Sequence, residues 1–332
     1  MTRLPTYDVW PDSAEADDEA ITALHELQAA CRAEESPLLP VRSRADALGW
    51  FRSPPADERR SLWLARDAHH DVVGAAWLAC QANATAASEV MVPASLRGQG
   101  VGSALLERVT DAARSAGMAT LTGACASPAA RAFLEHRGAV SGHTHVRQVL
   151  DRTRAPASAL AGPDAVLPDG AFLASWVSPT PEHLMAAYAV AKDAINDAPM
   201  EEFDREVWTG ERIRGLEQTL TARGSATHVS TVQQDGMILA FTEIRVSEAA
   251  GATAATQDTA VVASARRRGY GAAVKRASLL HLRQQRPDVR FVTTTNDARN
   301  VAMLRINRRL GFEPVARYTQ LSLPLVPGPA SH

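Results

Sequence analysis

The sequence predicts an α/β (α+β) protein of two similar domains, and three observations support this fold class. The chain has 332 residues, which is enough for two domains that each build a core. One glycine-rich turn occurs twice, and its equivalent glycines, Gly100 and Gly269, lie 169 residues apart. The same order of strands and helices is predicted around both copies, so the chain is expected to contain a duplicated unit.

Apolar periodicity predicts the elements of the first half in order. Short apolar runs indicate strands, and the helix after the turn repeats Val101, Ala104, Leu105, Val109 and Ala112 on one side, where they would cover a sheet. The predicted elements are a helix over 18–34, strands over 61–65, 72–80 and 88–92, a helix over 100–115, a strand over 120–124, a helix over 128–136 and a strand over 145–150.

The second half repeats this order after a connection rich in alanine and proline, residues 151–170, which is predicted to be a linker. The two domains are therefore predicted over 1–150 and 171–332. The elements of the second are a helix over 181–196, strands over 228–233, 237–246 and 258–262, a helix over 271–285, a strand over 289–294, a helix over 298–310 and a strand over 318–324.

Each glycine-rich turn follows a strand and opens a helix. Glycine lets the backbone turn sharply, and the first N–H groups of a helix have no partner within the helix. Together with the helix dipole they favour an anion such as a pyrophosphate. Two other phosphate-binding motifs fail on spacing. Ser103 and Val274 replace the third glycine of a Rossmann turn, and neither Lys192 nor Lys275 lies in a Gly-Lys-Ser/Thr sequence, which disfavours hydride transfer and nucleotide hydrolysis.

The repeated turn resembles the acetyl-CoA-binding motif Arg-x-x-Gly-x-Gly of the GCN5-related N-acetyltransferase (GNAT) superfamily. Residues 92–106 resemble the signature run of that family, and residues 259–275 and 294–312 are similar to its motifs A and B. In layout the chain resembles tandem members such as mycothiol synthases and aminoglycoside-type antibiotic N-acetyltransferases. The resemblance implies acetyl-CoA as acyl donor and mixed, mostly antiparallel sheets with splayed central strands, which in the second half would be 237–246 and 258–262.

The resemblance also implies which residues bind the cofactor. A strand end would hold the pantetheine arm and the turn would hold the pyrophosphate, although a solvated turn is the alternative for the arginines and helix capping for Asn300. In the second half the candidates are Val261, Val262, Ala263, Arg266, Arg267, Arg268, Gly269, Tyr270, Gly271, Ala272, Asn296, Asn300 and Asn307. In the first half they are Met91, Val92, Arg97, Gly98, Gln99, Gly100, Val101, Gly102 and Ser103.

Acetyl transfer to an amine needs a group that removes a proton from the amine. We predict Glu243 as this base, because it lies on a strand beside the cofactor and residues 77–79 of the first half offer no matching carboxylate. An ion pair with a neighbouring arginine is the alternative. Tyr318 is a second catalytic candidate, with a half-buried core position as its alternative. Leu134 and Asn307 stand where many GNAT members have the tyrosine that protonates the leaving thiolate.

An acidic stretch between two predicted helices is expected to bind a cationic acceptor, although a plain surface loop explains it as well. Its candidate residues are Asp197, Glu201, Glu202 and Asp204. Only the second half carries Glu243, so catalysis is predicted there. The first half lacks a Gly-Phe pair at 137–139 and is expected to be a degenerate, cofactor-binding or scaffold domain.

These residues predict an acetyl-CoA-dependent N-acetyltransferase that acts on the primary amine of a small cationic molecule, with an aminoglycoside-like antibiotic as the leading acceptor. Three alternatives stay open. They are acetylation of a thiol-sugar precursor, as in mycothiol synthase, acetylation of protein lysines, and a non-catalytic acyl-CoA-binding sensor or scaffold. Turnover with any amine would separate the enzyme from the sensor.

The composition argues against other classes. A net charge of −2 and a pI near 6.6 give no basic surface for nucleic acid. No apolar run is long enough for a bilayer, and the acidic N-terminus is unlike a signal peptide, so a cytoplasmic protein is expected. Three scattered cysteines, and a pair of histidines, His143 and His145, without a third ligand, predict no metal. The oligomeric state stays open, with a homodimer as one option.

Overall fold

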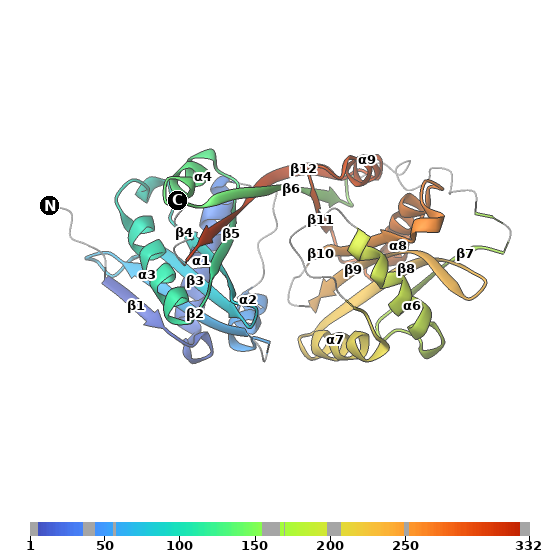
Figure 1. Ribbon diagram of the computed structural model, residues 1–332, viewed down its shortest axis with the longest axis horizontal. Helices are drawn as coiled ribbons and strands as arrows, with labels where there is room; N and C mark the ends of the chain where they lie inside the picture. The colour runs from blue at the N-terminus through green and yellow to red at the C-terminus, as the bar shows by residue number, and fades with distance from the viewer. Residues whose placement is uncertain are drawn as a thin grey trace, which may run out of the picture. The chain divides into compact units, whose positions relative to one another are not determined.

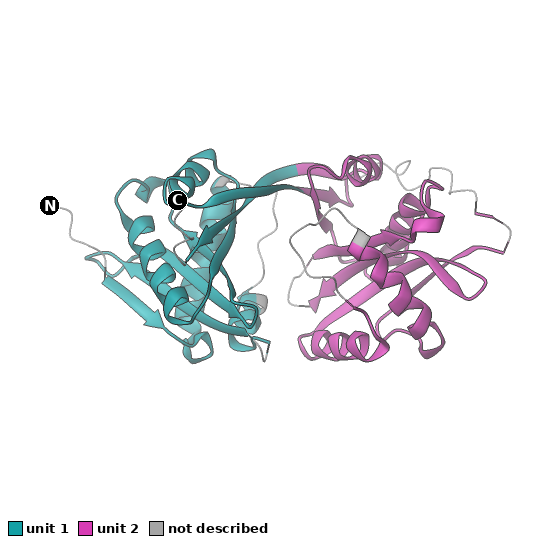
Figure 2. Cartoon of the chain, viewed as in Figure 1, with its two compact units in different colours: residues 1–146, 315–332 teal, residues 147–314 magenta. Residues whose placement is uncertain are grey.

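The computed structural model describes residues 6–35, 44–55, 58–154, 167–168, 170–197, 207–248 and 252–325. The chain divides into two compact units, which Figure 2 colours separately. Unit 1 comprises residues 1–146 and 315–332, and unit 2 comprises residues 147–314. Each unit places helices on a mixed β-sheet (Figure 1), so the predicted fold class is confirmed.

Unit 1 is built on strands in the order β1-β2-β3-β4-β5-β12. The strands are β1 (Thr6–Trp10), β2 (Glu58–Arg66), β3 (Val72–Gln81), β4 (Thr85–Met91), β5 (Thr120–Cys125) and β12 (Glu313–Pro324). The helices are α1 (Asp18–Glu35), α2 (Arg44–Arg52), α3 (Val101–Ser115) and α4 (Pro128–Glu135), with the short 3-10 helices η1 (Ser13–Glu15) and η2 (Ala94–Leu96).

Alternation along β2 explains why helices cover both faces of this sheet. Side chains of a strand point to opposite faces in turn. Leu62 and Leu64 are buried in one cluster with Leu24 of α1. Trp63 is buried in another cluster with Leu105 of α3. The sheet of unit 1 therefore carries α1 and α2 on one face and α3, the helix that follows the glycine-rich turn, on the other.

Unit 2 is built on strands in the order β11-β10-β9-β8-β7. The strands are β7 (Phe172–Val177), β8 (Ser225–Gln234), β9 (Met237–Ser247), β10 (Thr253–Val261) and β11 (Phe291–Asp297). The helices are α6 (Met185–Lys192), α7 (Gly210–Ala222), α8 (Tyr270–Gln285) and α9 (Val301–Arg309), with the short 3-10 helices η3 (Glu182–Leu184), η4 (Asp193–Asp197) and η6 (Ala263–Ala265).

Alternation along β9 sets the two faces of this sheet. Phe241 is buried in a cluster with Tyr188 of α6. Ala240 is buried in a different cluster with Val274 of α8. Because Glu243 follows Phe241 by two positions, it lies on the face that α6 covers. The carboxylate predicted from the sequence is thus placed between the sheet and α6.

The last strand of the chain returns to unit 1. Residues 319–324 of β12 pair antiparallel with 125–120 of β5. Strand β6 (Val140–Asp151) gives residues 140–146 to unit 1 and 147–151 to unit 2. The sequence-based boundaries assign residues 171–332 to one domain, whereas the contacts assign residues 315–332 to unit 1. An internal repeat shows that a final strand exists, but it does not show which sheet edge that strand joins.

The parallel strand pair of each unit is joined at one end only. In unit 2, β10 and β11 pair through residues 253–255 and 291–293, and among the described residues no further pair joins them. In unit 1, β4 and β5 pair in the same way through residues 85–87 and 120–122. Both pairs then separate towards the glycine-rich turn.

The prediction that β9 and β10 are the splayed strands is wrong. β10 pairs antiparallel with β9 from Ala254 to Val261, with a register shift between Thr256 and Thr259. The open pair is instead β10 with β11, whose connection runs through α8. Parallel neighbours need such a crossover, and the sequence pattern around it does not show how far the pairing extends.

Candidate functional site

The glycine-rich turn has the same backbone in both units. In unit 2, Arg267 and Gly269 adopt left-handed conformations, with φ of 64° and 84°. In unit 1, Gly98 and Gly100 adopt them at the equivalent positions, with φ of 77° and 88°. Neither α8 nor α3 has a side-chain N-cap, so no capping side chain covers the first N–H groups of either helix. Both turns can therefore present N–H groups to an anionic ligand.

One arginine in each unit fastens its own turn. Arg266 donates from Nε to the carbonyl oxygen of Val261 over 3.2 Å. Arg97 donates from Nε to the carbonyl oxygen of Val92 over 3.0 Å. These two arginines thus hold the end of the strand to the turn, while the remaining two arginines of unit 2, Arg267 and Arg268, are exposed.

The three predicted asparagines have contacts within unit 2. Asn300 caps α9, because its side chain accepts from the N–H of Met303 over 3.1 Å. Asn307 is fully buried and donates from Nδ2 to Gln148 over 2.9 Å and to Asn296 over 2.8 Å. Both hydrogens of the Asn307 amide are therefore in use. A role of these asparagines in cofactor binding stays a prediction.

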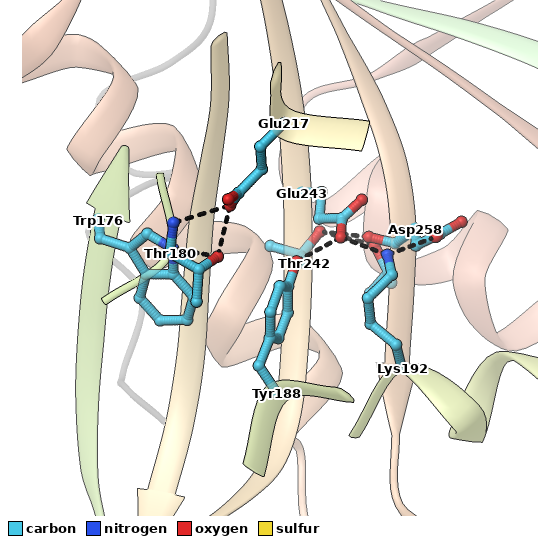
Figure 3. Close-up of polar contacts among 9 residues, drawn as sticks. Trp176, Thr180, Tyr188, Lys192, Glu217, Thr242, Glu243 and Asp258 are labelled. Carbon is cyan, nitrogen blue, oxygen red and sulfur yellow. Dashed lines mark hydrogen bonds and ion pairs between the residues drawn. The ribbon is translucent and has the colours of Figure 1, made fainter. Parts of the chain in front are cut away.

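A buried polar cluster lies between α6 and the sheet of unit 2 (Figure 3). Glu243 of β9 accepts hydrogen bonds from the Tyr188 hydroxyl and, over 2.5 Å, from Lys192 Nζ. Lys192 also pairs with Asp258 of β10 over 3.2 Å. Burial, and then the charge of Glu243, raise the pKa of Tyr188 well above its usual value, so this hydroxyl stays protonated and donates. The four side chains form one network, defined here as the Lys192 cluster.

Aromatic rings enclose the Lys192 ammonium. Its Nζ lies 4.1 Å from the ring centre of Trp208, 5.4 Å from that of Phe241 and 5.7 Å from that of Tyr188. A buried charge is costly unless it is paired, and here two carboxylates and the faces of these rings stabilise it. Lys192 is 2 % exposed, so its position is closely determined.

The two carboxylates of the Lys192 cluster differ in exposure. The side chain of Glu243 is 8 % exposed, and that of Asp258 is 37 % exposed. Asp258 also lies at the register shift of β10, one residue before Thr259. The carboxylate that can meet a ligand is thus Asp258, which sequence reasoning missed. A signal was available, because Asp258 stands 169 residues after Glu89, the same spacing that relates the glycines.

Unit 1 has a carboxylate at the equivalent place with neutral partners. Glu89 of β4 accepts from Gln28 of α1 over 2.9 Å and from Trp77 of β3 over 3.2 Å. Trp77 lies directly opposite Glu89 in the strand pairing. Both units therefore fix a carboxylate of the central strand through a donor from the first helix, and only unit 2 uses a cation for this among the residues described.

A second network braces the other end of the same helical layer. Glu217 of α7 accepts over 2.7 Å from both the N–H and the hydroxyl of Thr180, which in turn accepts from Trp176 of β7 (Figure 3). Arg214 donates to the second oxygen of Glu217 over 3.1 Å. These contacts tie β7 to α7.

The remaining predicted residues are not brought into the Lys192 cluster. Tyr318 lies on β12 in unit 1 and is half-buried, so it belongs to a different unit from Glu243. Asp197 ends η4, and Glu201, Glu202 and Asp204 lie outside the described residues. A role for the acidic stretch in acceptor binding therefore stays a prediction.

Two further searches concern the described part of the chain. No three His, Cys, Asp or Glu side chains in it come together as a metal site, and His143 and His145 lie on β6. No helix in it is long and apolar enough to cross a membrane.

Comparisons with known proteins identify the fold. Residues 58–138 match the family model of the acetyltransferase (GNAT) domain. A tandem GNAT protein from the clavulanic acid biosynthesis pathway, solved without acetyl-CoA, superposes with a TM-score of 0.78 at 26 % identity, over 98 % of this chain and 100 % of that one. The chain is a tandem GNAT protein. The match of the family model lies in unit 1, the unit that the sequence analysis expected to be degenerate.

Other solved tandem GNAT folds are similar at lower identity. A GCN5-related N-acetyltransferase from Sphaerobacter thermophilus has a TM-score of 0.73 at 17 % identity and covers 98 % of both chains. The glucosamine N-acetyltransferase region of a fungal multi-domain β-N-acetylglucosaminidase has a TM-score of 0.63 at 14 % identity, over 97 % of this chain and 38 % of that one. No curated protein sequence matches the chain. With its GNAT domain the protein is an acyltransferase, and GNAT acetyltransferases in general use acetyl-CoA.

Proposed function

We propose that this GNAT protein transfers the acetyl group of acetyl-CoA to the primary amine of a small cationic molecule, with an aminoglycoside-like compound as the leading acceptor. The observation that carries the proposal is the half-buried carboxylate of Asp258 on the strand that leads into the turn of unit 2. Asp258 and Glu243 place two negative charges beside one lysine, and the remaining negative charge favours a cationic acceptor.

The reaction assigns one step to each side chain of the Lys192 cluster. Asp258 accepts the proton as the amine nitrogen attacks the thioester carbonyl, so a C–N bond forms and the C–S bond breaks. Glu243, buried and bound by Tyr188 and Lys192, supplies charge and holds Lys192. Asn307 has both amide hydrogens engaged, so it gives no proton to the leaving CoA thiolate.

The residues for acetyl-CoA follow from the backbone of unit 2. We assign the pyrophosphate to the turn over 266–272, where the left-handed conformation at Gly269 and the uncapped start of α8 suit an anion. The pantetheine arm is assigned to the backbone of 261–263, beside the opening between β10 and β11. The turn over 97–103 in unit 1 is assigned the same ligand.

The relative from clavulanic acid biosynthesis supports a role in small-molecule metabolism, because the two chains match over their whole lengths at 26 % identity. Acetylation of a thiol-sugar precursor, acetylation of protein lysines and a non-catalytic acyl-CoA sensor are kept as outcomes of the test below. The cytoplasmic location and a homodimer stay predictions.

The test is CoA release from acetyl-CoA with a panel of amines that contains aminoglycosides, aminosugar thiol precursors and lysine peptides. Gly269→Ala and Gly100→Ala form a matched pair, because both glycines adopt φ near 85° and an alanine strains either turn. The proposal predicts turnover with a cationic small amine that Gly269→Ala lowers and Gly100→Ala preserves. Acetyl-CoA binding by calorimetry without release of CoA from any amine would favour the sensor.

A further inference from the structure

The Lys192 ammonium holds one oxygen of the carboxylate that faces the acceptor. It contacts Oδ2 of Asp258 over 3.2 Å while Glu243 holds it from the other side over 2.5 Å. Within the described residues, Oδ1 of Asp258 has no hydrogen-bond partner. Lys192 therefore fixes the orientation of Asp258 and leaves its second oxygen for a ligand.

The fold itself does not need a cation at this place. In unit 1, the neutral amide of Gln28 makes the matching contact to Glu89, and Trp77 supplies the second donor. Unit 2 instead buries a lysine, at a desolvation cost, and surrounds it with Trp208 and other rings. A charge kept where a neutral donor suffices in the sister unit is explained by a task of that charge.

We propose that Lys192 is a positioning residue for acetyl transfer and acts through Asp258. The inference rests on the proposed function of unit 2. The ammonium orients Asp258 towards the acceptor amine and offsets the repulsion between Asp258 and Glu243, so that the two carboxylates can lie close together. Arg245 of β9 and Glu217 of α7 are the other charged groups packed near the cluster, and neither makes a direct contact with Lys192 among the described residues.

The test replaces Lys192 by the donor that unit 1 uses. Lys192→Gln is compared with Lys192→Arg, which keeps the charge, and with Tyr188→Phe, which removes the other donor to Glu243 but leaves the contact to Asp258. The measurements are kcat and KM with the best amine of the panel, the Kd of acetyl-CoA by calorimetry and the thermal unfolding midpoint. We expect Lys192→Gln to lower kcat about tenfold or more with the Kd of acetyl-CoA within about twofold. Lys192→Arg should recover most of the rate, and Tyr188→Phe should lower the unfolding midpoint more than kcat.

A double-mutant cycle separates positioning from a general structural effect. In an Asp258→Asn background, Lys192→Gln should change kcat by less than about twofold, because the group on which Lys192 acts is gone. An equal loss in both backgrounds, or an unchanged kcat in the single variant, would overturn the proposal.

Folding is covered by the double variant Lys192→Gln with Glu243→Gln, which removes both members of the buried ion pair together. This variant should fold and still show the loss of kcat, and a wild-type kcat in it would overturn the proposal. A wild-type enzyme that releases no CoA with any amine overturns the proposed function and this inference together. An active wild type whose rate does not depend on Lys192 overturns the inference alone.

Discussion

Replacing Lys275 with methionine should stabilise unit 2. Lys275 lies on α8 with 3 % exposure, and no hydrogen bond or ion pair engages its ammonium within the described residues. The residues around it are Thr242, Ile244, Thr256, Ser278, Leu279 and Phe312. Burial alone lowers the pKa of Lys275 from 10.5 to about 7. The folded state therefore disfavours the protonated lysine that the unfolded chain prefers at neutral pH.

The magnitude follows from this lowered pKa. A change from 10.5 to about 7 corresponds to about 4 kcal/mol of lost stability at pH 7, since each unit is worth about 1.4 kcal/mol. Methionine has a similar length and carries no charge, so Lys275→Met should raise the free energy of unfolding by about 2–4 kcal/mol. For a unit of this size that is a rise of roughly 5–15 °C in the unfolding midpoint.

The pH dependence gives a second readout. Because the folded pKa of Lys275 lies below the unfolded one, the unfolded chain binds more protons between pH 7 and pH 10.5, and wild-type stability rises with pH in that range. Urea unfolding at pH 7 and pH 9 should show the advantage of Lys275→Met shrinking by about 2 kcal/mol.

The other lysine of the chain is the matched control. Lys192→Met leaves Glu243 and Asp258 without their cation and should destabilise unit 2 by about 3–5 kcal/mol. Two lysine-to-methionine changes of opposite sign would support the account of both sites. The reasoning about Lys275 is refuted if Lys275→Met is less stable than wild type at pH 7, or if its advantage does not change with pH.

Three further predictions concern other positions. Burial and the nearby His281 lower the pKa of His228 to about 4, so wild-type stability should fall by up to about 3 kcal/mol as pH drops from 6.5 towards 4, and His228→Gln should flatten this acid limb in urea titrations. Gly123→Ala would place a Cβ 2.9 Å from a backbone carbonyl of β4, so the unfolding midpoint of unit 1 should fall by several degrees in a thermal melt, and an unchanged midpoint would contradict the close packing. In calorimetry, Gly269→Ala and Gly100→Ala should each remove acetyl-CoA binding from one unit, and a single binding event that neither change weakens would count against both turns as sites.

The repeated turn made much of this fold predictable. Local sequence decides a strand, a turn and an amphipathic helix, so the helices over 101–115 and 270–285 were found within about a residue. The order of elements around both turns followed from the repeat. Helices α2 and α7 and the edge strands β1 and β7 were missed, because their patterns are weak and tertiary packing stabilises them.

Long-range pairing could not be read from the pattern. The return of β12 to unit 1, with residue 319 opposite 125, depends on which sheet edge is open, and this moved Tyr318 out of unit 2. The splay between β10 and β11 likewise depends on where parallel pairing stops.

The candidate site was predicted in part. Glu243 was identified as a carboxylate near the cofactor strand, but its burial depends on Tyr188 and Lys192, which come from a distant helix. Asp258 was within reach of the sequence, because its spacing from Glu89 equals that of the glycines. The chemical role of a carboxylate thus follows from its exposure and partners, which only the fold supplies.

The most direct test compares the two carboxylates that stand 169 residues apart. Asp258→Asn and Glu89→Gln are made in the full chain, and kcat/KM for CoA release is measured with the best amine of the panel. The account predicts a loss of about 100-fold or more for Asp258→Asn, since a positioned base contributes at least that factor, and a change below about threefold for Glu89→Gln. A large loss in Glu89→Gln with an active Asp258→Asn would contradict the account and place the reaction in unit 1.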